Sequence, residues 1–449
     1  MYKNSPWTVV GVLAFGVAVG TMQMTVVVPV LPALQRELDA PLSTPSWTLT
    51  AALLSGAVSI PLLSRLGDLY GRRRMALASL GLLVTGSVAA ALATTVAGVI
   101  AGRILQGMAA PLLPLAIGIV RQETPRDRLP TAIGVLSAMM GVGSGGGMIL
   151  AGVVGDGYQV LFWTLAGLAA AAAALIAVCV RESPLPPTGA RPDLAGTVLM
   201  AAWLVCLLLA VSKGASWGWA SVPTLGLLAA AAVLLAAWVL SARRAAAPLV
   251  EIPMLLHPGT VGASVASLLL GFSLFCTITT LSSVAQSGLG ASVLQVGLYL
   301  LPAALMMTAV SLPAGLLMRR FAASSLVGAG ASTVVAAALG LGAAYGSPTA
   351  IYGATAVLGL GMGLGYAALG TMAVEHVEPA KTAAAGGVNA LVRVVGSSLA
   401  GAVTAAVLPT AGPGWSFAAA AAAALVAAVF AFSHGALDRK PAPAVKEAM

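Results

Sequence analysis

The sequence predicts an all-α integral membrane protein with 14 transmembrane helices: two bundles of six helices, with two additional helices between them in the chain. Composition is the first reason. Of the 449 residues 59% are apolar and only 8% are charged, whereas a soluble domain carries roughly 25% charged residues. The second reason is that the apolar stretches are long and lack the alternation of membrane β-strands. Helices satisfy their own backbone hydrogen bonds in lipid, and we therefore expect the long apolar stretches to be helices.

The number of spans follows from stretches without Asp, Glu, Lys or Arg, because a spanning helix needs about 20 mostly apolar residues. Stretches long enough for one span are 4–35, 40–64, 129–155, 157–180, 194–212 and 214–242. Stretches long enough for two spans are 75–120, 252–318, 321–374 and 382–437, the first and last being interrupted by Arg103 and Arg393. Six single and four double stretches make 14 spans.

Basic residues predict the orientation. With the N-terminus in the cytoplasm, 18 of the 22 Lys and Arg residues fall in cytoplasmic segments, as the positive-inside rule requires. The first apolar run is too long for the core of a signal peptide, so it is a retained span. We therefore expect a multi-pass protein of the plasma membrane with both termini in the cytoplasm. The net charge of +9 suits loops beside an anionic membrane surface, and we expect no nucleic-acid partner.

Two polar linkers divide the chain. Residues 1–181 form the first six-helix bundle, residues 182–258 contain a linker and a two-helix insert, and residues 259–449 form the second bundle. A faint repeat relates the bundles, because Pro61–Arg65 and Pro313–Arg320 follow the second helix of each one. Parallel six-helix halves are a transporter architecture in which the binding site lies near the middle of the membrane.

The strongest local motif is Ser64-Arg-Leu-Gly-Asp-Leu-Tyr-Gly-Arg-Arg-Arg74, between the second and third spans. Asp68 at a helix exit can pair with a nearby arginine or face the positive N-terminus of another helix; the alternative is an ordinary basic loop. The motif resembles the loop signature Gly-x-Leu-Ala-Asp-x-x-Gly-Arg-Arg of the major facilitator superfamily, with Ser64 in place of the first glycine. The resemblance implies that Asp68, Gly71 and Arg72 control the conformation and that Asp68 braces the eleventh span of the twelve-span core.

Further segments resemble the fourteen-span drug:proton antiporter branch of that family. They are Arg103–Gly107, Gly141–Gly152, Asp193–Leu249, Gln286–Pro302 and Asn389–Gly396. The resemblance implies export of drugs or antibiotics by alternating access, with a proton gradient as the driver. It also suggests that Gly143 and Gly147 let helices slide or bend during gating, although glycines at this spacing equally serve close helix packing.

The departures from that branch concern its polar residues. Gln23 stands where the branch has an acid in the first span, and Val28 stands where it has Asn. Ala52 replaces a Tyr in the second span, and Met148 replaces a Pro in the fifth. None of the 13 acidic residues lies in the middle of a predicted span. These departures count against ordinary proton coupling and against recognition of cations.

The candidate cavity residues are the polar and charged side chains within spans: Gln23, Arg103, Gln106, Asn389 and Arg393. Buried charges in membranes are costly and usually functional, and arginine stays protonated. Either arginine can instead anchor helix packing through backbone carbonyls, and the amides can make interhelical hydrogen bonds. We hypothesise that the pocket accepts neutral or anionic amphiphiles better than lipophilic cations.

Three functions remain open: an exporter, a facilitator or importer of a small metabolite without proton coupling, and a membrane enzyme or sensor. No catalytic constellation supports an enzyme, and we expect neither cofactor nor metal. The three cysteines, Cys179, Cys206 and Cys276, lie in apolar runs and are interpreted as small buried residues. The expected partners are a small-molecule substrate, protons and the lipid bilayer, and the expected state is a monomer.

Overall fold

A computed structural model describes residues 5–27, 34, 37–38, 45–125, 128–154, 157–182, 193–245, 248, 250–378 and 381–438. The linker 183–192 and Val28 lie outside these residues. The first half of the described chain contains α1 (Pro6–Thr25), α3 (Pro45–Tyr70), α4 (Arg72–Leu92), α5 (Val96–Gly107), α6 (Leu112–Glu123), α7 (Leu129–Val154) and α8 (Tyr158–Cys179). The remainder contains α9 (Leu194–Trp217), α10 (Val222–Arg244), α11 (Ile252–Leu256), α12 (Pro258–Gly288), α13 (Val293–Leu317), α14 (Ala323–Ala344), α15 (Pro348–Met372), α16 (Thr382–Ala411) and α17 (Pro413–Asp438).

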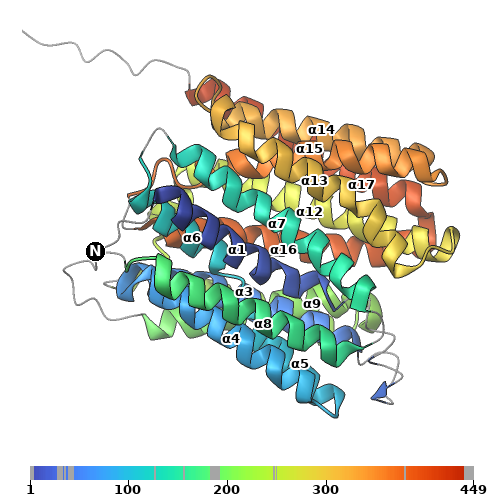
Figure 1. Ribbon diagram of the computed structural model, residues 1–449, viewed down its shortest axis with the longest axis horizontal. Coiled ribbons are helices and arrows are strands. Elements are labelled where there is room, and N and C mark those ends of the chain that lie inside the picture. Colours follow the sequence, from blue (N-terminus) through green and yellow to red (C-terminus); the bar gives the residue numbers. More distant parts are fainter. Residues whose placement is uncertain are drawn as a thin grey trace, which may run out of the picture.

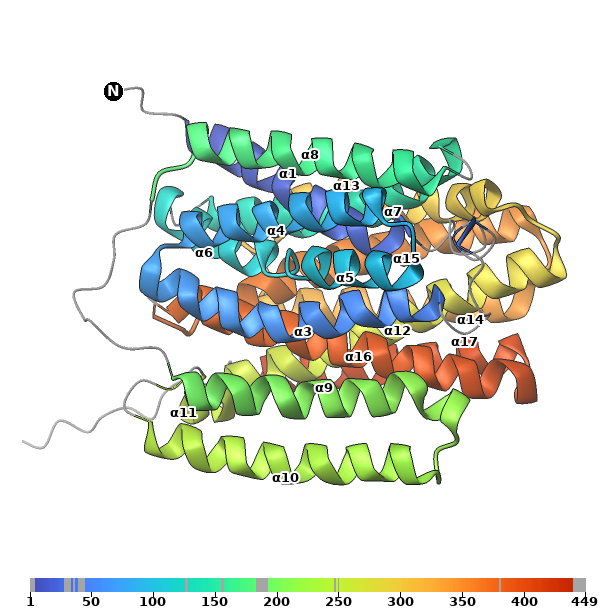
Figure 2. The ribbon, with the colours of Figure 1, turned by 90° about the horizontal axis from the view of Figure 1, so that it is seen from below.

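The described helices form 14 segments that are long and apolar enough to cross a membrane, which confirms the predicted number. Figure 1 shows the helices lying side by side, with α1 and α3–α8 in one bundle and α12–α17 in the other. Figure 2 shows α9 and α10 along one side of the two bundles. The predicted fold class is therefore confirmed. The division at residues 181 and 258 stays a prediction.

Two helices extend beyond the uncharged stretches of the sequence. The stretch 40–64 ends before Asp68, whereas α3 continues to Tyr70 and holds Asp68 in its last turn. Arg72, at the start of α4, pairs with the Asp68 carboxylate. Lys213, which lies between the stretches 194–212 and 214–242, is within α9 and is 7% exposed. Its ammonium group lies 4.2 Å from the centroid of the Trp47 ring, a cation–π contact that favours burial of the charge.

The fourth span is broken in the middle, which the sequence did not predict. Between α5 and α6 the backbone N–H groups of Ala109 and Ala110 donate to the carbonyls three residues earlier, over 3.0 Å each. This tight 3₁₀ geometry replaces the α-helix just before Pro111, which has no N–H to donate. The break directly follows the predicted Arg103–Gly107 segment.

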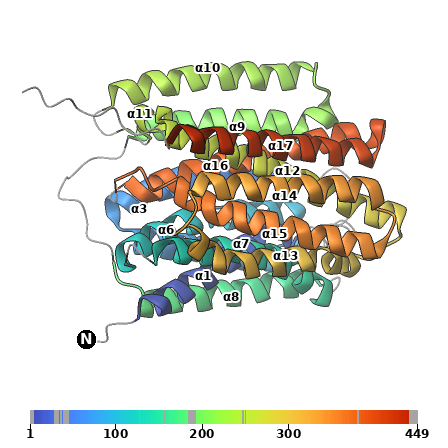
Figure 3. The ribbon, with the colours of Figure 1, turned by 90° about the horizontal axis from the view of Figure 1, so that it is seen from above.

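The helix α9 covers the seam between the two bundles where α3 lies against α16. Figure 3 shows α10 at the edge of the molecule, with α9 between it and the other helices. At one end of α9 the hydroxyl groups of Thr50 and Ser212 lie 3.3 Å apart, and the rings of Trp47 and Trp217 lie 6.4 Å apart. Toward the other end one buried apolar cluster joins α3, α9 and α16 through Ala57, Ile60, Met200, Leu204, Leu208, Val388 and Leu391.

Single cysteines will test the alternation of the spans. In a variant without the three native cysteines, we expect Ser347→Cys to react with a membrane-impermeant maleimide on intact cells. Ala322→Cys should react only after permeabilisation, because α14 separates the two exposed positions. Labelling of both on intact cells would show that the predicted orientation or the span is wrong.

Candidate functional site

The carboxylate of Asp68 joins the two bundles at the end of the molecule where α3 ends and α4 begins, which we call the Asp68 end. Its Oδ1 accepts a hydrogen bond from Nε of Arg72 over 2.8 Å and lies 2.6 Å from Nη2. Its Oδ2 accepts from the backbone N–H of Ala384 over 2.9 Å, in the first turn of α16. A carboxylate at this position is stabilised by the helix dipole. Both partners that the sequence allowed for Asp68, an arginine and a helix N-terminus, are therefore present together.

A second contact between the bundles lies beside the first. The guanidinium of Arg121, at the end of α6, donates to the hydroxyl of Thr382 and to the carbonyl of Val377, over 2.7 Å each. Arg72 also donates to the carbonyl of Gly118 over 2.7 Å, which ties α6 to the motif. Sequence reasoning did not single out Arg121, because a basic residue at the end of a span looks like any other residue of a basic loop.

Gly71 forms the one-residue turn between α3 and α4. Its φ of 110° favours glycine, and a Cβ there would lie 2.5 Å from the carboxylate of Glu182. That carboxylate accepts the backbone N–H groups of Arg73 and Arg74, over 3.1 and 3.2 Å, at the start of α4. Gly71 and Glu182 therefore shape the start of α4. Sequence reasoning did not single out Glu182.

Three of the five predicted cavity residues form a closed cluster inside the first bundle. Arg103 donates to the carbonyl of Thr48 over 3.2 Å, to the carbonyl and side-chain oxygens of Gln23 over 2.7 and 3.0 Å, and to Oε1 of Gln106 over 2.6 Å. Gln106 in turn donates to Ser87 over 2.9 Å. The side chains of Gln23, Arg103 and Gln106 are fully buried. The cluster ties α1, α3, α4 and α5 together, which is the anchoring alternative for Arg103.

The glycines of α7 lie on two faces of the helix. Gly143 and Gly147, the predicted gating glycines, lie against α1, where Thr25 donates to the carbonyl of Ser144 over 2.8 Å. Their contacts therefore stay within the first bundle. Gly141 and Gly145 face α13 of the other bundle, and a Cβ at Gly141 would lie 2.7 Å from Sδ of Met307.

The other two predicted cavity residues, Asn389 and Arg393, line a small cavity between the bundles. Its walls come from α6, α7, α15 and α16: Leu113, Ile117, Ser137, Tyr366, Gly370, Ala373, Gly386, Asn389, Ala390 and Arg393. Its volume is about 20 Å³, which is room for about one water molecule. The cavity begins at the first turns of α16, which carry the Asp68 contact.

Within this cavity the two polar side chains differ in their partners. The amide of Asn389 accepts from Ser267 over 3.2 Å and donates to the carbonyl of Ala263 over 3.1 Å, so it joins α16 to α12. The guanidinium carbon of Arg393 lies 5.2 Å from the centroid of the Tyr366 ring. Eleven residues separate Arg393 from Thr382 at the start of α16, or about 16 Å at a rise of about 1.5 Å per residue. Arg393 therefore lies close to the middle of a membrane about 30 Å thick.

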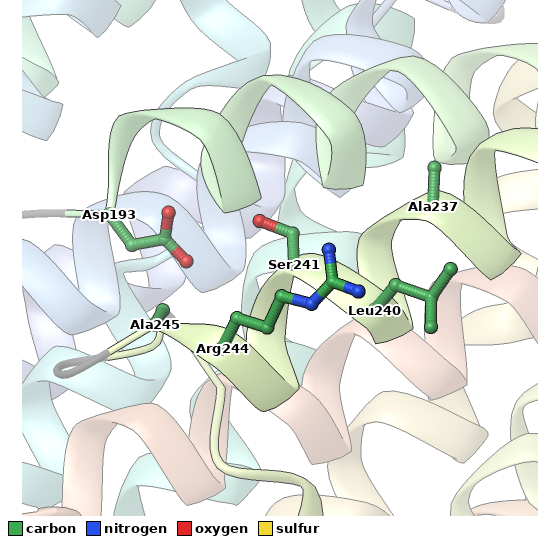
Figure 4. A pocket seen from close by; sticks show the side chains of 6 residues that line it. All are labelled: Asp193, Ala237, Leu240, Ser241, Arg244 and Ala245. Atoms are coloured by element: carbon green, nitrogen blue, oxygen red, sulfur yellow. The ribbon is translucent and has the colours of Figure 1, made fainter.

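A larger hollow of about 540 Å³ lies at the ends of α9 and α10. Figure 4 shows Asp193 at the start of α9, and Ser241 and Arg244 near the end of α10. Asp193 accepts the backbone N–H of Gly196 over 2.7 Å and so caps α9. All of the residues that line this hollow belong to the insert, so it is separate from the cavity between the bundles.

Comparison with known proteins points to one family. The model of the Major Facilitator Superfamily matches residues 13–400 and again residues 263–448. The tetracenomycin C resistance and export protein of Streptomyces glaucescens is 30% identical over 414 residues, which are 89% of this chain and 76% of that protein. An uncharacterized MFS-type transporter of Mycobacterium tuberculosis is 32% identical over 69% of this chain and 45% of its own length. The structure of the human organic anion transporter MFSD10 superposes with a TM-score of 0.74 at 16% identity, covering 96% of this chain and 100% of that one.

The Arg103 cluster predicts a loss of stability without a change of selectivity. Arg103→Ala leaves buried carbonyl and amide oxygens without donors, at a cost of about 1–3 kcal/mol for each. We expect a lower Tm and a lower yield of the purified protein, with the same order of preference among transported compounds. Ile104→Ala, at the neighbouring position that is 44% exposed, is the control and should change neither. An altered order of preference would assign Arg103 to the substrate.

The Asp68 contact predicts a change in access to the cavity. Asp68→Asn removes a charged hydrogen-bond acceptor worth about 1.5–3 kcal/mol, which shifts an equilibrium between two states about 10- to 150-fold. We expect Ser137→Cys, in the cavity wall, to react faster with an impermeant thiol reagent from the Asp68 side. Glu182→Gln is the matched control, because this carboxylate accepts the backbone N–H groups of Arg73 and Arg74 at the start of α4. Equal rates in Asp68→Asn and the parent would show that Asp68 does not hold this end closed.

Proposed function

Because this chain belongs to the Major Facilitator Superfamily, we propose that it is a secondary active transporter that exports small amphiphilic compounds, such as drugs or antibiotics, by alternating access. The family comprises transporters and not enzymes. The proposal is supported by the 30% identity to a protein named for resistance and export, which extends over 89% of this chain. The export direction, the substrate and the driving gradient belong to the proposal.

The proposed mechanism rests on where the cavity lies relative to the contacts between the two bundles. The cavity lies near the middle of the membrane, and the Asp68–Ala384 and Arg121–Thr382 contacts lie between it and the Asp68 end. Opening that end requires both contacts to break. With the predicted orientation the Asp68 end faces the cytoplasm, so the structure corresponds to a state closed toward the cytoplasm.

The seam between α7 and α13 provides the surface along which the bundles move. Glycines of α7 lie against α13 at Gly134, Gly141 and Gly145, where a side chain would collide with the other helix. Small residues let two helix backbones approach closely and slide without interlocking side chains. The predicted gating pair Gly143 and Gly147 keeps α1 attached to α7, so these two helices move together.

The resemblance implies that the proton-motive force is the energy source. Among the fourteen described spans, the only acidic residues are Asp68 and Glu123, and both lie in the last turn of their helices. We propose that the transporter works as a monomer, since each chain contains both bundles. The alternative is a facilitator or importer of a small metabolite without proton coupling. Its support is Gln23, which stands at the position of an acid and is bound to Arg103.

A susceptibility panel in a pump-deficient bacterial host separates these two functions. For an exporter, expression of the chain raises the inhibitory concentration of some amphiphilic compounds and lowers their accumulation, and a protonophore reverses both effects. Asp68→Asn at equal expression should protect less. A facilitator would instead leave susceptibility unchanged and speed equilibration of a metabolite with or without the protonophore. That result would contradict the proposed export.

A further inference from the structure

Arg393 is the one charged side chain among the ten described residues that line the cavity between the bundles. The rest of the lining is mostly apolar, with the hydroxyl groups of Ser137 and Tyr366 and the amide of Asn389 as its polar groups. Because the Asn389 amide is bound by Ser267 and Ala263, the positive charge dominates the electrostatics of the cavity.

Arg393, which is partly buried, differs in its partners from the buried arginines Arg72 and Arg103. Arg72 is paired with the Asp68 carboxylate, and Arg103 is surrounded by four oxygen acceptors. Within the described residues, the aliphatic part of the Arg393 side chain lies beside Gly271 of α12 and its guanidinium faces the Tyr366 ring. The described part of the chain therefore offers it no carboxylate. A cation near the middle of a membrane is costly and marks a functional position.

We infer that Arg393 binds the negative group of an amphiphilic organic anion, and that the membrane potential drives the export of this anion. This inference rests on the proposed export function. The guanidinium offers a planar fork of donors that suits a carboxylate, while Leu113, Ile117 and Ala390 offer an apolar surface for the body of the molecule. With about 20 Å³ the cavity is closed in this state, so the anion enters after the bundles move apart.

The negative charge of the substrate also couples its export to the membrane potential. The interior of a bacterial cell is electrically negative, so an anion gains free energy when it leaves. No residue then needs to carry a proton through the membrane, which agrees with the absence of acidic residues from the middle of the described spans. A protonophore abolishes the potential together with the pH gradient, so sensitivity to it does not distinguish this mechanism from proton exchange.

An assay with purified protein in liposomes distinguishes export driven by the membrane potential from proton exchange. It uses two probes that share the dansyl group: dansylglycine, an anion, and dansylcadaverine, a cation. A potassium gradient with valinomycin sets the potential, and nigericin sets the pH gradient. We expect the protein to move dansylglycine toward the positive side. At a potential of about 100 mV the equilibrium accumulation is about 50-fold, equivalent to about 2.3 kcal/mol per charge. A pH gradient alone should produce no accumulation, and dansylcadaverine should move little.

Substitutions at Arg393 then assign the charge to this residue. Arg393→Gln should lose most of the dansylglycine flux, whereas Arg393→Lys, which keeps the charge, should retain dependence on the potential. Melting temperatures of both variants show that they are folded. If Arg393 only anchored helices, Arg393→Gln would lose dansylglycine flux together with a lowered Tm and Arg393→Lys would not restore the dependence on the potential, and this would overturn the inference.

Three results in liposomes would also overturn the inference. They are accumulation that follows the pH gradient, a preference for dansylcadaverine, and no movement of dansylglycine. The susceptibility panel in cells tests export independently of the probes. A positive panel with a negative liposome result would leave the proposed function standing and remove only the anion assignment.

Discussion

The closed end of this molecule depends on one carboxylate that serves two bundles. Asp68 neutralises Arg72 and accepts the backbone N–H of Ala384, while Arg72 itself donates to the carbonyl of Gly118. One buried group therefore connects α3, α4, α6 and α16. A buried ion pair is weakly stabilising as a whole, but removal of one partner leaves an uncompensated charge. The contact to α16 is a single hydrogen bond beside that pair, so the bundles can separate while the charges stay neutralised within the first bundle.

The two seams between the bundles differ in chemistry. Where α3 meets α16, hydrogen bonds close the Asp68 end, and α9 covers the seam with the apolar side chains of Met200, Leu204 and Leu208. Where α7 meets α13, glycines bring the two backbones into close contact. Small residues let two helix backbones approach closely. The proposed motion would break the first set of contacts and displace the helices along the second.

Two arginines within the spans, Arg103 and Arg393, have different surroundings in this fold. Arg103 donates to the carbonyl oxygens of Thr48 and Gln23 and to the amide oxygens of Gln23 and Gln106. The fork of Arg393 lies over an aromatic ring at the boundary between the bundles. The contacts of Arg103 therefore stay within the first bundle, whereas Arg393 lines the cavity between the bundles. Both residues carry the same charge, and their surroundings differ.

The sequence by itself determined the class of protein, the 14 spans and the place of the Asp68 motif, because lipid requires long apolar helices and charge is tolerated near their ends. It also marked Asn389 and Arg393, two of the polar residues that line the cavity. It did not distinguish Gln23, Arg103 and Gln106 from Arg393, since all four are polar residues within apolar runs. In the structure the first three bind one another, whereas Arg393 lines the cavity. Nor did it distinguish Gly143 and Gly147 from Gly141 and Gly145, because the direction of a helix face depends on its neighbours. Arg121 and Glu182 likewise acquire their contacts through segments distant in the chain. Only the tertiary structure, which decides which surfaces meet, assigned these residues to their positions.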